Sequence, residues 1–156
     1  DRNRYICPMA TLTVTIQEEL TINGKDRGNT NTISLSSVSE VYSRVLTVDN
    51  TEQTILQFQA TRPAGGAFTD NTMQYLRITN LAASNTVDLR IQDTANTKEY
   101  FVRIGGSESF MLFNDLVDAD ATVGTGISLT QIELISAEAT GTGGETADIE
   151  IFAVAT

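Results

Sequence analysis

The chain has 156 residues, which is enough for one domain with a single hydrophobic core and short for two. Its formal net charge of −10 argues against nucleic-acid binding, because such binding depends on Lys and Arg residues that neutralise phosphates. The sequence contains no histidine, so it cannot build a Ser-His-Asp or Cys-His arrangement and lacks the commonest metal ligand. No pair of carboxylates stands out as a general acid and base, and we therefore expect neither an enzyme nor a cofactor.

The first eight residues differ from the rest of the chain. They are basic where the remainder is acidic, and they contain the only cysteine, Cys7. Met9 resembles a natural translation start, so residues 1–8 are either a non-native extension or an arm that lies on a neighbouring subunit. We expect a single β-sandwich domain at residues 9–156, and we take Arg2, Arg4 and Tyr5 as candidate partner contacts.

Residues 10–23 show the two-residue periodicity of strands. Leu12, Val14 and Ile16 alternate with polar residues, and Glu18 interrupts the alternation, which indicates a bulge or bend between two short strands. The same reading along the chain predicts strands at 10–17, 19–23, 31–36, 40–48, 53–60, 73–81, 85–93, 98–104, 108–113, 130–137 and 146–154.

Turn-forming residues separate these segments, as at Asn23-Gly24, Asp49-Asn50 and Gly105-Gly106. The only helical candidate is one turn at 114–117. Many short strands divided by turn signals predict an all-β protein, and we expect a single antiparallel β-sandwich, jelly-roll-like.

The middle third of the chain reads as a meander in which the strand at 75–78 returns at 87–92 and leaves again at 100–104. In that register Arg77, Arg90 and Arg103 lie on outward faces among Asp88 and Glu99. A solvated face with ion pairs explains these arginines, and the alternative is a contact surface for an acidic neighbour.

Three other patterns have plain structural explanations. Asp115, Asp118 and Asp120 crowd one loop, but their spacing does not match a calcium-binding hand, so no metal is expected. The glycines at 124–126 and 141–144 precede strand patterns rather than a helix, so they do not form a phosphate cradle. The aromatic residues are expected to pack in the core: Tyr75, Tyr100, Phe101, Phe110, Phe113, Phe58 and Phe68. The strand at 108–113 has apolar residues on both faces, which suits a central position or contact with a partner.

Several segments carry a resemblance to a known family. They are residues 9–25 (MATLTVTIQEELTINGK), 75–81 (YLRITNL), 87–91 (VDLRI), 100–104 (YFVRI) and 148–154 (DIEIFAV). Together they resemble small virion structural proteins of marine tailed bacteriophages, especially cyanophage-like ones. The resemblance covers residues 9–156 in strand and turn texture, without an invariant motif. It implies a β-sandwich, homo-oligomerisation, a place on the capsid surface or along the tail of the particle, and no cofactor.

The expected function is therefore that of a phage virion structural protein. The preferred role is a capsid decoration (cement) protein that binds copies of itself, with a trimer favoured, and the major capsid protein, without nucleic acid or membrane. The first alternative is a tail, neck or fibre component that forms a ring or attaches to the host. The second is a carbohydrate-binding β-sandwich, against which the absence of tryptophan argues.

Overall fold

The protein is all-β. The computed structural model describes residues 10–59, 67–69, 72–93, 99–113, 116–117, 130–141 and 145–156, and every element among them is a β-strand. None of these residues belongs to a helix that could cross a membrane. The helical turn expected at 114–117 is wrong, because Leu116–Val117 is strand β12, which pairs with residues 130–131.

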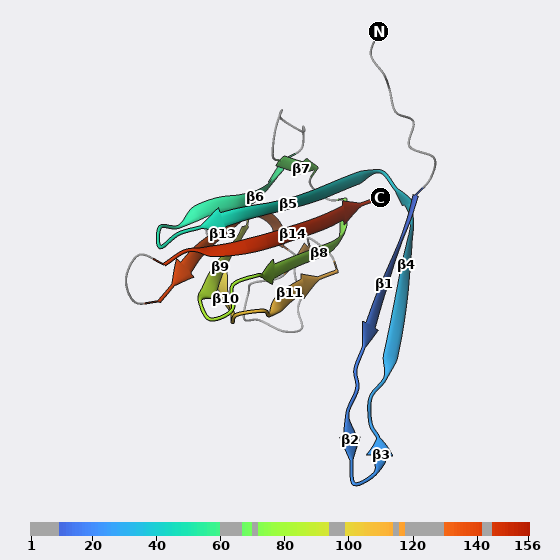
Figure 1. The fold of residues 1–156 in the computed structure, drawn as a ribbon. Helices are drawn as coiled ribbons and strands as arrows, with labels where there is room; N and C mark the ends of the chain where they lie inside the picture. Colours follow the sequence, from blue (N-terminus) through green and yellow to red (C-terminus); the bar gives the residue numbers. More distant parts are fainter. Residues whose placement is uncertain are drawn as a thin grey trace, which may run out of the picture.

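Two sheets form the body of the molecule (Figure 1). The sheet nearer the projecting hairpin, here called the arm-side sheet, has the order β11-β8-β14-β5. Its strands are β5 (Glu40–Val48), β8 (Met73–Asn80), β11 (Ser109–Leu112) and β14 (Ala147–Ala155). The other, here called the far sheet, has the order β10-β9-β13-β6-β7, with β12 paired to β13. Its remaining strands are β6 (Gln53–Gln59), β7 (Ala67–Thr69), β9 (Thr86–Asp93), β10 (Glu99–Ile104) and β13 (Thr130–Thr140).

The two sheets enclose one core. In β14, Ile149, Ile151 and Ala153 point inward, and in β9, Val87 and Leu89 do the same, so the apolar half of each alternating strand is buried. The expected antiparallel β-sandwich is confirmed, and the β6–β7 pair is parallel. The chain passes between the sheets at β5–β6, β7–β8, β8–β9, β10–β11, β11–β12 and β13–β14.

The meander expected in the middle third is wrong at its first connection. β9 pairs with β10 as expected, but β8 pairs with β11 and β14 in the other sheet. An alternating strand buries one apolar face whether its successor is in the same sheet or the opposite one, so periodicity alone does not distinguish these arrangements. Here residues 81–85 carry the chain across the sandwich.

The buried side chain of Asn80 holds that crossing in place. Its amide nitrogen donates to the carbonyl oxygens of Asn85 at 2.7 Å and Gly105 at 3.0 Å, and its oxygen accepts from the backbone nitrogen of Ala82 at 3.0 Å. Asn80 is fully buried, and the backbone nitrogen of Leu81 donates to Asp148 at 2.8 Å. One polar side chain therefore ties the link at 81–85 to the turn that follows β10.

Residues 10–38 form a separate hairpin that projects from the body (Figure 1). We call it the arm. Its long strands, β1 (Ala10–Gln17) and β4 (Thr30–Val38), pair only with each other, and its tip consists of β2 (Thr21–Ile22) and β3 (Lys25–Asp26). The strands predicted at 10–17 and 31–36 thus form, but outside the two sheets of the sandwich.

The arm has a bend and a tight turn where the sequence indicated them. Strand pairing stops at Glu18 and resumes at Thr21, which confirms the bulge or bend expected there. A Cβ atom at Gly28 would lie 1.9 Å from the carbonyl oxygen of Glu18, so only glycine fits this close approach. At the tip, Asn23 and Gly24 both have positive φ, 52° and 74°, as a two-residue hairpin turn requires.

Two expectations about packing need correction. Phe58 and Phe68 are buried and their rings meet edge to face, but Phe101 points outward from the far sheet and is 65% exposed. The strand at 108–113 is not central, because β11 lies at the edge of the arm-side sheet. Met111 and Phe113, on its second apolar face, are therefore partly exposed, although the Phe113 ring contacts Tyr75.

Candidate functional site

The arginines taken as candidate contacts do not share one surface. Arg77 lies on β8 in the arm-side sheet, whereas Arg90 and Arg103 lie on neighbouring strands of the far sheet. Arg2, Arg4 and Tyr5 lie outside the described residues. The structure thus brings together only Arg90 and Arg103, and it places Arg77 in the opposite layer.

Each of these three arginines has a carboxylate partner within the chain. Arg103 and Asp88 make two hydrogen bonds of 2.6 Å each, and this hydrogen bonding, followed by the charge of Asp88, raises the pKa of Arg103 above its ordinary value. Arg77 contacts Glu150 at 2.7 Å, and Arg90 contacts Glu52 at 2.5 Å. These cations are satisfied internally, so their positions support a solvated face with ion pairs.

The described residues offer no metal site. No group of three or more Asp, Glu, Cys or His side chains among them could hold an ion. Asp115, Asp118 and Asp120 lie outside the described residues, as do the glycines at 124 and 126.

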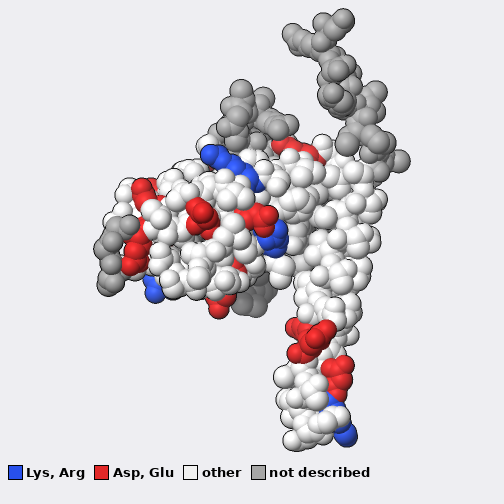
Figure 2. Space-filling view, viewed as in Figure 1, with Lys and Arg blue, Asp and Glu red and all other residues white. Residues whose placement is uncertain are grey.

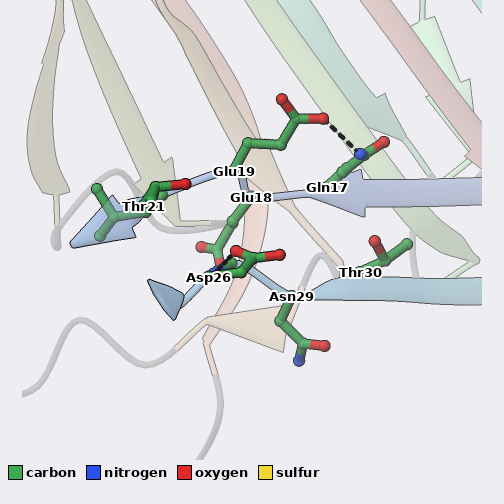
Figure 3. Close-up of a pocket in the computed structure, with 9 residues that line it drawn as sticks. Gln17, Glu18, Glu19, Thr21, Asp26, Asn29 and Thr30 are labelled. Atoms are coloured by element: carbon green, nitrogen blue, oxygen red, sulfur yellow. Dashed lines mark hydrogen bonds between the residues drawn. The ribbon is translucent and has the colours of Figure 1, made fainter. Parts of the chain in front are cut away.

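A hollow with a volume of about 480 Å³ lies at the bend of the arm (Figure 3). Its polar side chains are engaged with their own hairpin: Gln17 donates to Glu19 at 2.8 Å, and Asp26 accepts from the backbone nitrogen of Gly28 at 2.8 Å. Glu18 donates through its backbone nitrogen to Asn29. These bonds form the bend itself, and they leave the hollow as an open surface depression.

The arm presents an apolar stripe on one face. Leu12 pairs with Leu35 and Val14 with Ile33, while Thr and Ser residues occupy the opposite face. Neither long strand contains a charged residue, and the charged side chains of the arm gather toward its free end (Figure 2). From Ala10 to the tip the arm spans roughly 45 Å at the usual rise of a strand.

The base of the arm is seated on the body. Leu12, Val14 and Leu35 pack against Tyr75, Val154 and Phe152 on the outer face of the arm-side sheet. The outer face of this sheet therefore accepts an apolar ribbon. Beyond this contact, the arm ends in two exposed apolar side chains, Leu20 at 53% and Ile22 at 49%.

The same outer face continues past the base of the arm. Val41 and Val45 project from the edge strand β5 and are 53% and 58% exposed. Arg44 lies between them in the sequence, but it pairs with the buried Ile151, so its side chain projects from the other face of the strand. The candidate functional surface is thus the arm together with the outer face of the arm-side sheet.

Sequence reasoning identified the strands of the arm but not their exposure. The composition of the polar faces does indicate this difference between the arm and the body. Strands whose outer face meets water in the body carry charges there, such as Asp88 and Arg90 in β9 or Asp148 and Glu150 in β14. β1 and β4 carry none.

No protein-family model matches the chain, and no curated protein matches it either. The interpretation of this surface therefore depends on its geometry.

Proposed function

We propose that the protein is a structural component of an assembled particle and that the arm is its docking element. The observation that carries this proposal is a two-stranded ribbon, roughly 45 Å long, that projects from the sandwich and whose two long strands carry no charge. The body has its own core, and no residue of the arm belongs to that core cluster.

A free ribbon of this kind is unfavourable in water. An isolated two-stranded hairpin is marginally stable, because its backbone pairing and one apolar face must offset the entropy of ordering it. Its two outer edges expose unpaired N–H and C=O groups, which proteins usually protect with Lys, Pro or bulges. β1 and β4 contain neither charge nor proline. We infer that another chain covers the ribbon in the functional state.

The proposed setting is a phage particle, with the protein decorating the capsid surface. The sequence resemblance supports this setting, and jelly-roll-like sandwiches occur among viral capsid domains. Such sandwiches also occur in lectins, so the fold alone does not distinguish a decoration protein from a carbohydrate-binding one. In this role the protein binds copies of itself and the major capsid protein. The free energy of these contacts stabilises the particle, and the protein catalyses no reaction.

Binding to shells tests the proposal. Purified protein is mixed with bare shells of the host particle and sedimented, and bound copies are counted by quantitative mass spectrometry. We expect binding in numbers comparable to those of the shell subunits, and a reduction by roughly tenfold or more when Ile16→Thr and Ile33→Thr remove apolar surface from the arm. Phe101→Ser, on the far sheet, serves as the matched control and should bind normally.

The outcomes separate the alternatives. Loss of binding in the arm variant with normal binding in the control supports a docking arm. A copy number equal to a single ring supports a tail or neck position instead of decoration. Equal binding of all three proteins, or no binding to any virion component, contradicts the proposal.

A further inference from the structure

The arm and the outer face of the arm-side sheet complement each other, yet one chain cannot bring the two together beyond the base. The tip side chains Leu20 and Ile22 lie at the free end of a ribbon that leads away from the body (Figure 1). Val41 and Val45 remain exposed on the body. We propose that the arm of one copy seats its outer part on the arm-side sheet of a second copy.

The contact at the base of the arm shows that these surfaces fit. There, alternating apolar residues of β1 and β4 pack across the outer face of this sheet and cover Tyr75 and Val154. Beyond the base, Ile16 continues the same alternation as far as the bend at Glu18, and Val41 pairs directly with Val154 in the neighbouring strand. The exposed valines thus extend an apolar surface that already accepts this ribbon.

The arginines of the body do not take part in this contact. Arg77, Arg90 and Arg103 are paired with carboxylates of their own chain. Arg44 pairs with the buried Ile151, so its side chain lies on the face of β5 opposite to Val41 and Val45. The proposed contact is therefore apolar.

The resulting contact joins two different surfaces, so it is heterologous. Each copy donates an arm and accepts one, and such a contact closes into a ring when the rotation between copies permits it. This inference rests on the proposed role of the arm as a docking element, and it names the neighbour as an identical chain. If the arm binds the capsid protein instead of a second copy, this inference fails, but binding to shells is unaffected.

Sedimentation of the full chain over a range of concentrations tests the inference without any particle. We expect concentration-dependent self-association. The arm variant Leu20→Ser/Ile22→Ser and the face variant Val41→Ser/Val45→Ser should each weaken it by roughly tenfold to a hundredfold, because each removes two apolar side chains from the contact. Phe101→Ser removes an equally exposed apolar side chain from the far sheet and should associate as the unaltered chain does.

Mixing the two variants provides a sharper test. The arm variant keeps an intact face and the face variant keeps an intact arm, so together they should form a one-to-one pair that grows no further. A symmetrical arm-to-arm contact predicts no complex in the mixture. Unchanged unfolding midpoints in both variants would show that the sandwich is intact.

The inference is overturned if the unaltered chain remains monomeric, if the mixture forms no pair, or if Phe101→Ser weakens association as much as the arm variant does. If the protein is a monomer and binds bare shells through its arm, the partner of the arm is not a second copy, and the proposed docking function still holds.

Discussion

Replacing Asn80 with alanine should destabilise the sandwich strongly, although the change removes only one small polar side chain. The amide makes three hydrogen bonds of 3.0 Å or shorter to backbone groups, and it is completely buried. Each such bond contributes about 1 kcal/mol, and buried backbone groups left without partners cost more. We therefore expect Asn80→Ala to lower the free energy of unfolding by about 3 kcal/mol.

For a chain of this length, that loss corresponds to a decrease in Tm of roughly 6–12 °C. Urea unfolding followed by circular dichroism gives the free energy, and calorimetry gives the midpoint. Asn85→Ala is the matched control, because its side chain makes one exposed hydrogen bond, to the carbonyl oxygen of Thr146 at 2.8 Å. Removing that bond should cost less than about 1 kcal/mol.

The comparison has a clear contrary result. In that result, the free energy of unfolding of Asn80→Ala lies within about 0.5 kcal/mol, the error of such measurements, of that of the unaltered chain. It would show that water or a rearranged loop replaces the amide and that Asn80 does not hold the crossing. Equal losses in both variants would show that any amide near this link matters, and that the buried position of Asn80 has no special effect.

Three further changes test other parts of the structure. Gly28→Ala should open the bend, since the added Cβ would lie 1.9 Å from the Glu18 oxygen, and hydrogen exchange should then accelerate in residues 18–29 while the Tm of the sandwich stays unchanged. Burial raises the pKa of Tyr100 above its ordinary value of 10.0, so stability should be complete below pH 10 and decline as the pH rises further. Tyr100→Phe should remove part of that alkaline decline in urea unfolding, and an identical decline would contradict it. Arg103→Gln, at an exposed pair with Asp88, should leave the midpoint within experimental error.

The sequence predicts individual strands well because each one has a dry face and a polar face. Ile149, Ile151 and Ala153 give that pattern in β14, and the structure buries all three. The pattern depends only on neighbours along the chain, so it survives without knowledge of the fold. Turn chemistry is equally local, as Asn23-Gly24 shows at the tip of the arm.

Features that depend on distant residues could not be predicted in this way. Asn80 looks like an ordinary strand end in the sequence, and its partners at Gly105 and Asn85 become its neighbours only once the sandwich has closed. Phe101 is a different case, because a local pattern does predict its position. Its alternation within β10 places it outside, and only the assumption that aromatic residues pack inward led to the wrong expectation.

The arm shows what alternation cannot distinguish. Leu12, Val14 and Ile16 have the same spacing as the buried side chains of β14, because alternation reports that a strand has one apolar face and not what covers it. In β14 the opposite sheet covers that face. In the arm, the described residues of the body cover only the base, and the polar face carries Thr and Ser where solvated strands of the body carry Asp, Glu and Arg. The apolar face of the ribbon and the unpaired backbone groups of its edges are unfavourable in water, and this is the physical reason to assign their cover to another chain.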